Sequence, residues 1–153
     1  LAKADVGLQG ACIDLGGWDT HADQGTLDGE LNSLADQLAR GLAAFATDMD
    51  DRKNRLTVVV VSEFGRTVAE NGSAGTDHGH GNAMLVYGGG INGGQVIADW
   101  PTLANDQLDE EGDLRITTDY RDVLAEILEK RGGNTNLNAL FPNHQTSPVG
   151  ITM

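Results

Sequence analysis

The sequence predicts an α/β fold, built on a βαβ unit with a mostly parallel sheet and flanking helices. Residues 56–61 form a nearly continuous β-branched run, which is typical of a central strand buried on both faces. Apolar residues between Leu27 and Met49 recur three and four positions apart, which is the period of one helix face. A short apolar segment, residues 11–15, precedes this helix. Strand, helix and strand therefore follow one another as in a right-handed crossover unit.

The remaining elements are predicted from apolar patterns interrupted by glycines and acidic residues. They are a strand at residues 84–87, a short strand at 95–97, an irregular acidic loop at 101–116, a helix at 119–130 and a short turn at 137–141. Cys12, the single cysteine, lies in the first apolar segment. We expect it to be a small core residue rather than a nucleophile.

The composition restricts the class of partner. The chain of 153 residues has a formal net charge of −13 and 10 Lys and Arg residues. It offers no basic stripe for a polyanion, so nucleic acid is excluded as a partner. No apolar run approaches the ~18 residues of a membrane span, which argues against membrane insertion. A small anionic substrate stays compatible, because a bound cation reverses the local field.

Side chains that could bind a metal follow the predicted strands. Asp19 and His21 come after the first strand, and Glu63 comes after the second. Asp77, His78 and His80 lie on the loop that leads into the third strand. Sites in open α/β sheets form beyond the carboxyl ends of the strands, so three loops distant in sequence can meet there. The predicted metal ligands are Asp19, His21, Glu63, His78 and His80.

Carboxylate oxygen and imidazole nitrogen are ligands that suit Zn²⁺, Mn²⁺ or Fe. We therefore expect a divalent metal as cofactor, with Zn, Mn or Ca as the candidates. Short motifs of this kind also cap turns, which is the alternative interpretation. Arg66 has two interpretations as well, because it could grip a phosphate or sulfate bidentately or pair with Glu63 or Glu70. His144 has no evident partner in the sequence, so we expect it at the surface.

Five motifs occur in an order that resembles one bacterial family. They are Gly-Gly-Trp-Asp-Thr-His, Ser-Glu-Phe-Gly-Arg, Glu-Asn-Gly-Ser, Gly-Thr-Asp-His-Gly and Thr-Asp-Tyr-Arg. Over about residues 10–128 the chain resembles the proteins grouped as domain of unknown function 1501, which are often exported by the twin-arginine pathway. That family looks related to the alkaline phosphatase and sulfatase superfamily. The resemblance implies that residues 1–153 are a single domain, corresponding to the C-terminal part of a larger alkaline phosphatase-like domain.

The resemblance also implies roles for particular residues. Asp19 and His21 resemble the Asp and His that hold one metal before a long helix, with Asp14 as a rival for the Asp role. Glu63 and Phe64 stand where the superfamily has Asp and His, so one His ligand is replaced by an apolar residue.

His78 or His80 resembles a later His ligand of the superfamily. The implied activity is metal-dependent hydrolysis of a small phosphate or sulfate ester, with the nucleophile outside this segment and a periplasmic or exported location. We expect residues 1–153 alone to bind a divalent metal weakly and to hydrolyse little or nothing. The alternatives are a non-catalytic metal- or ligand-binding module that keeps the fold, and an acidic structural domain without a metal.

Overall fold

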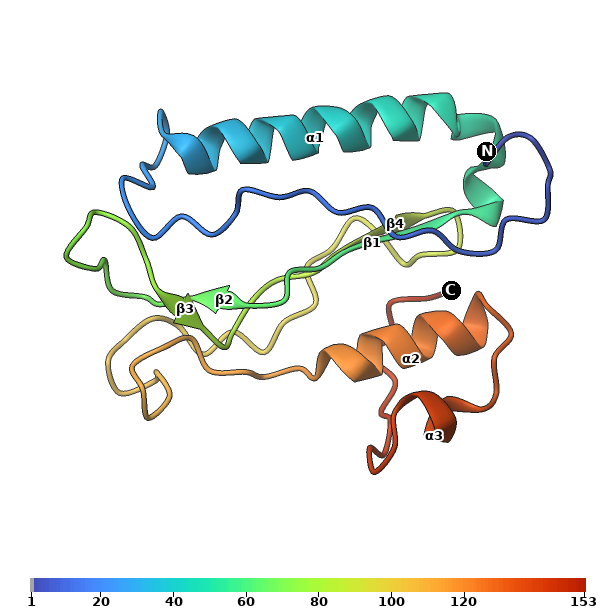
Figure 1. The fold of residues 1–153 in the computed structure, drawn as a ribbon. Coiled ribbons are helices and arrows are strands. Elements are labelled where there is room, and N and C mark those ends of the chain that lie inside the picture. The colour runs from blue at the N-terminus through green and yellow to red at the C-terminus, as the bar shows by residue number, and fades with distance from the viewer. Residues whose placement is uncertain (1) are drawn as a thin grey trace. The chain divides into compact units, whose positions relative to one another are not determined.

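The computed structural model describes residues 2–153 and confirms an α/β fold (Figure 1). Its elements are α1 (Glu30–Asp48), the 3-10 helix η1 (Asp50–Arg55), β1 (Thr57–Val60), β2 (Gly65–Arg66), β3 (His78–Gly79), β4 (Leu85–Gly88), α2 (Tyr120–Lys130) and α3 (Leu137–Leu140). The chain divides into two compact units. Unit 1 comprises the chain up to Arg52 together with Ala69–Asp77, and unit 2 comprises Lys53–Val68 and His78–Met153. No helix in residues 2–153 is both long and apolar enough to cross a bilayer.

In unit 1, α1 confirms the helix predicted from apolar spacing but begins at Glu30 rather than Leu27. The delay has a backbone cause. Gly25 has φ of +66°, and a Cβ on either Gly25 or Gly29 would collide with the backbone of the other glycine. This tight turn occupies the residues just before the helix, so helical backbone starts only after Gly29.

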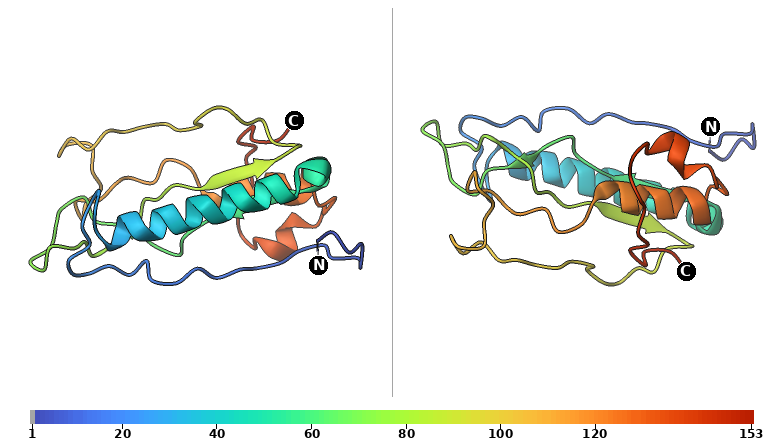
Figure 2. Two further views of the ribbon diagram at one scale, coloured as in Figure 1. Left: turned by 90° about the horizontal axis from the view of Figure 1, so that it is seen from above. Right: turned by 90° about the horizontal axis from the view of Figure 1, so that it is seen from below.

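The N-terminal segment runs back along α1 in unit 1 without forming a strand (Figure 1, Figure 2). Lys3 Nζ lies 2.9 Å from Asp48 Oδ1, which ties the segment to the end of α1. The predicted strand at residues 11–15 is therefore wrong, and so is the predicted burial of Cys12, which is exposed. Ile13 is 90% exposed. An apolar run becomes a strand only where a neighbouring strand pairs with it, and no described strand pairs with this one.

Unit 2 contains two small antiparallel sheets. β1 pairs with β4 in a register that runs from Thr57 opposite Gly88 to Val60 opposite Leu85. β2 pairs with β3, with Arg66 opposite His78. The mostly parallel, alkaline phosphatase-like sheet predicted from the sequence is thus not what residues 2–153 form, because the strand that a βαβ unit needs before α1 is missing. Residues 95–97 also form no strand.

The core of unit 2 lies between α2 and the β1–β4 sheet (Figure 1, Figure 2). Its buried residues are Val123, Ile127 and Ile151, packed against Val59, Met84, Val86 and Val149. Two of these come from the last residues of the chain, where Thr152 also bridges to Ile91. The core therefore closes only when the C-terminal segment returns to α2.

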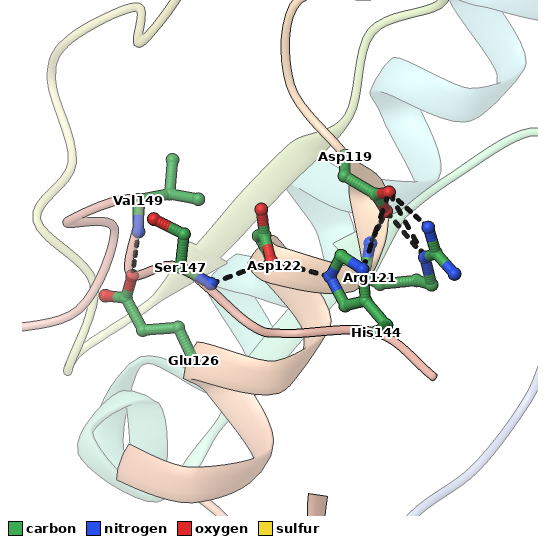
Figure 3. Close-up of polar contacts among 7 residues, drawn as sticks. All are labelled: Asp119, Arg121, Asp122, Glu126, His144, Ser147 and Val149. Carbon is green, nitrogen blue, oxygen red and sulfur yellow. Dashed lines mark hydrogen bonds and ion pairs between the residues drawn. The ribbon is translucent and has the colours of Figure 1, made fainter. Parts of the chain in front are cut away.

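Glu126 holds that returning segment (Figure 3). Its Oε2 accepts hydrogen bonds from the amides of Val149 at 2.8 Å and Gly150 at 2.7 Å. Its Oε1 accepts from the Thr152 amide at 2.8 Å and hydroxyl at 2.7 Å. Burial alone would raise the pKa of Glu126, but the bonds from Thr152, Gly150 and Val149 outweigh it and hold the pKa below the ordinary value of 4.5.

Two further carboxylates, one at the N-cap and one in the first turn of α2, organise the same region (Figure 3). Asp119 caps the helix by accepting from the Arg121 amide, and the Arg121 guanidinium lowers the pKa of Asp119 to about 2. Asp122 Oδ1 accepts from the Ser147 amide and lies 2.8 Å from His144 Nε2. The expectation that His144 is a surface residue is wrong, since 12% of its side chain is exposed and Asp122 is its partner.

We predict that Glu126→Gln destabilises unit 2 by about 2 kcal/mol, because an amide NH₂ would face backbone donors that need an acceptor. Urea denaturation at pH 7 measures this. The pKa of Glu126 is depressed in the folded state, so its contribution is present above pH ~4.5 and lost as the pH falls through the lower folded-state value. The substituted protein should lack that part of the acid destabilisation. Glu129→Gln, an exposed change on the same helix, is the control, and equal effects of the two changes would contradict the prediction.

Candidate metal centre

The His21 imidazole lies between two carboxylates of unit 1. Its Nε2 is 2.9 Å from Asp19 Oδ1, and its Nδ1 is 2.9 Å from Asp77 Oδ1. The side chains are about half exposed, at 45% for His21 and 58% for Asp19. The predicted pair of Asp19 and His21 is therefore brought together, and Asp77 joins it from 56 residues further along the chain.

The local backbone explains why Asp19 and His21 face one another. The His21 amide donates to the Asp19 carbonyl at 3.1 Å, which closes a tight turn. Thr20, between them, is buried and donates its hydroxyl to Gln24 Oε1 at 2.8 Å. Because Thr20 is anchored inward, its two neighbours lie on the exposed side of the turn.

Asn71 brings Asp77 to this turn. Its Nδ2 donates to the His21 carbonyl at 2.9 Å and to Asp77 Oδ1 at 3.0 Å. Its Oδ1 accepts from the amides of Ser73 at 2.9 Å and Gly75 at 3.1 Å. One half-buried amide side chain thus fixes both the loop and the carboxylate that faces the imidazole.

Gly75 allows the loop to reach His21. A Cβ at this position would collide with the backbone of His21 and Ala22. Two backbone hydrogen bonds hold the loop there, from the Asp23 amide to the Ser73 carbonyl at 2.9 Å and from the Gln24 amide to the Ala74 carbonyl at 3.0 Å. From the sequence, Asp77 lies near the predicted ligands without a role, and Asn71 enters only through the Glu-Asn-Gly-Ser motif. The available signal was the Asn-Gly-Ser turn sequence, which predicts a side chain bonded to nearby backbone.

This arrangement has the donor chemistry of a metal site. A metal-binding histidine usually donates its second ring N–H to a carboxylate, which orients the ring. With Nδ1–H donating to Asp77, the lone pair of Nε2 faces Asp19, and an ion held by both would place its ligand atoms about 3.3 Å apart. The distance between His21 Nε2 and Asp19 Oδ1, now 2.9 Å, would need to increase only slightly to admit such an ion. The same geometry also fits a protonated imidazole that donates to both carboxylates.

The other predicted ligands lie in unit 2. His78 stacks on Phe64, with ring centroids 4.0 Å apart and planes at 9°. The Arg66 guanidinium lies over the same Phe64 ring, 4.8 Å from its centroid. Glu63 is exposed. The two interpretations of Arg66 stay predictions.

His80 groups with two acidic residues of the loop predicted to be irregular. One ligand atom each from His80, Glu111 and Asp113 lie within 4.8 Å of one another. The structure therefore contains acidic and histidine side chains that could hold a metal, as expected in general terms. No sequence signal pairs His80 with residues some 30 positions away.

A family described as "Protein of unknown function (DUF1501)" matches residues 3–153. The chain belongs to this family. No curated protein and no solved structure matches it. The description of DUF1501 names no activity, so the function of this member must be argued from its own residues.

We predict that Asn71→Ala loosens the loop around His21 without unfolding the protein. The amides of Ser73 and Gly75 lose their acceptor, so their hydrogen exchange should accelerate more than tenfold. Exchange measured by NMR or mass spectrometry tests this. Asn32→Ala, an exposed change on α1, should leave these amides unaffected. Unchanged protection in Asn71→Ala would show that the side chain does not organise the loop.

Proposed function

We propose that this DUF1501 protein is a metal-dependent hydrolase of phosphate or sulfate esters that uses Asp19 and His21 as metal ligands. The observation that carries the proposal is the His21 ring, with one nitrogen toward Asp19 and the other toward Asp77. An orienting carboxylate behind a histidine is the usual support of a metal ligand. The resemblance to the alkaline phosphatase and sulfatase superfamily supports the same chemistry. The exported location is proposed only from the resemblance to DUF1501 proteins.

In this proposal each residue has a defined task. Asp77 accepts a hydrogen bond from His21 Nδ1–H, which leaves the lone pair on Nε2. Asn71 holds Asp77 in place through its amide. A bound divalent ion would supply Lewis acidity toward the oxygens of the ester. Arg66 is the proposed contact for the anionic oxygens, and Glu63, His78 and His80 stay predicted ligands.

The second candidate is a non-catalytic metal- or ligand-binding module, and one observation favours it. Phe64 stands where the superfamily has a metal-binding His, and its ring stacks face to face on His78. Arg66 packs on Phe64 as well. An apolar ring in place of a ligand removes a donor that a second catalytic metal would use. The two candidates share the Asp19 and His21 ligands and differ in turnover.

We predict that His21→Ala and Asp19→Asn each weaken Zn²⁺ or Mn²⁺ binding at this turn more than tenfold, and that Asp77→Asn weakens it about tenfold or more by releasing the ring. The ring resonances of His21 during an NMR titration report this site specifically. Asp23→Asn is the matched control, since Asp23 is an exposed acid two residues away. If the His21 ring does not respond to either metal, the metal proposal fails.

Turnover separates the two candidate functions. We expect protein purified from its native cells to hydrolyse an aryl phosphate or an aryl sulfate in a metal-dependent reaction that His21→Ala abolishes. Residues 1–153 alone should hydrolyse little. Metal binding at His21 without turnover of either ester by the native protein would favour the binding module.

A further inference from the structure

Three side chains of unit 2 converge outside the Asp19–His21 turn. His80 directly follows β3, while Glu111 and Asp113 come from the loop before α2. One nitrogen and two carboxylate oxygens lie within 4.8 Å of one another. None of the three belongs to the group of Asp19, His21 and Asp77, so the observation does not depend on that turn.

The loop that carries the two acids is held in one conformation by Asp109. Its Oδ1 accepts from the amides of Glu111 at 3.0 Å and Asp113 at 2.8 Å. The Asp109 amide donates in turn to the Asp113 carbonyl at 2.9 Å, and Gly112 adopts φ of +88° to complete the turn. Asp109 Oδ2 lies 3.6 Å from His80 Nδ1, so a carboxylate also stands beside the imidazole. The ligand atoms are thereby presented by an organised backbone.

Asp113 is the residue that points to a ligand. It is 5% exposed, yet no side chain or amide among residues 2–153 donates a hydrogen bond to its carboxylate or pairs with it. A buried carboxylate without a donor is unfavourable unless a cation compensates it. Every side-chain N or O atom that is fully enclosed in the described chain has a hydrogen-bond partner. Since the Asp113 oxygens have none among the described residues, they are not fully enclosed and keep some access to solvent. That access is the route by which an ion would enter.

The backbone beside His80 makes room for this carboxylate. Gly79 precedes His80, and a Cβ on Gly79 would lie 3.1 Å from Asp113 Oδ2. That separation is tighter than ordinary van der Waals contact, so a side chain here would push the carboxylate aside. Glycine at this position therefore lets Asp113 approach the segment that carries His80.

We propose that His80, Glu111 and Asp113 form a second metal site, which takes a transition-metal ion of the Zn²⁺ type. Three protein ligands with an open fourth position for water are a usual zinc arrangement. Ligand atoms on such an ion stand about 3.3 Å apart, and rotation of the exposed His80 and Glu111 side chains closes the observed spread. The imidazole selects against Mg²⁺ and Ca²⁺, which prefer all-oxygen ligand sets.

The test uses the His21→Ala protein, so that the turn at Asp19 does not contribute. We expect this protein to bind one equivalent of Zn²⁺ by calorimetry, with a shift of the His80 ring resonances. Asp113→Asn and Glu111→Gln, each added to His21→Ala, should lower the affinity more than tenfold. Glu110→Gln is the matched control, because it removes the same charge from an exposed neighbour on the same loop.

Three results would overturn the proposal: no Zn²⁺ bound by His21→Ala, no response of the His80 ring, or equal affinities in the Glu111→Gln and Glu110→Gln proteins. Glu111 is exposed, so its substitution keeps the test decisive even where Asp113→Asn disturbs the fold. Displacement of Zn²⁺ by a tenfold excess of Ca²⁺ would overturn the assigned ion class. Failure at His21 leaves these outcomes unchanged, so the two metal proposals fail separately.

Discussion

The core of unit 2 depends on one buried carboxylate. Glu126 accepts four hydrogen bonds from Val149, Gly150 and Thr152, and this brings Ile151 against α2. The strands that supply the other wall are only four residues long, so the sheet alone covers little of the helix. The returning segment replaces the missing strands, and its backbone amides need acceptors that no β-ladder provides. A charged side chain on α2 supplies them.

Side-chain oxygens that accept hydrogen bonds from backbone amides also hold two loops in shape. Asn71 accepts from the amides of Ser73 and Gly75, and Asp109 accepts from those of Glu111 and Asp113. Each side chain lies within four residues of the amides that it binds, which is the usual range of local side-chain capping. Part of the acidic excess of the chain therefore has a structural use. It organises long connections between short elements.

The difference between local and long-range interactions explains what could be predicted from the sequence. The bounds of α2 and β4 match the predictions nearly to the residue, because apolar spacing and glycine interruptions are local signals. The prediction of a strand at residues 11–15 failed because a strand needs a neighbouring strand to pair with, which apolar periodicity does not report. Asp19 and His21 were found for the local reason that they lie two positions apart in the sequence. Asp77, Glu111 and Asp113 reach their histidines through long-range folding, which leaves no periodic pattern.

Unused hydrogen-bonding capacity distinguishes a structural carboxylate from a ligand. A carboxylate offers about four lone-pair sites, and Glu126 fills them with two donors on each oxygen. Glu126 is therefore saturated and cannot coordinate an ion without releasing the C-terminal segment. Asp113 is buried to a similar degree but receives no hydrogen bond from residues 2–153. Burial removes water from both groups, so only the one with protein donors is already compensated. Asp113 still needs a positive partner, and His80 and Glu111 lie where they could help to bind one.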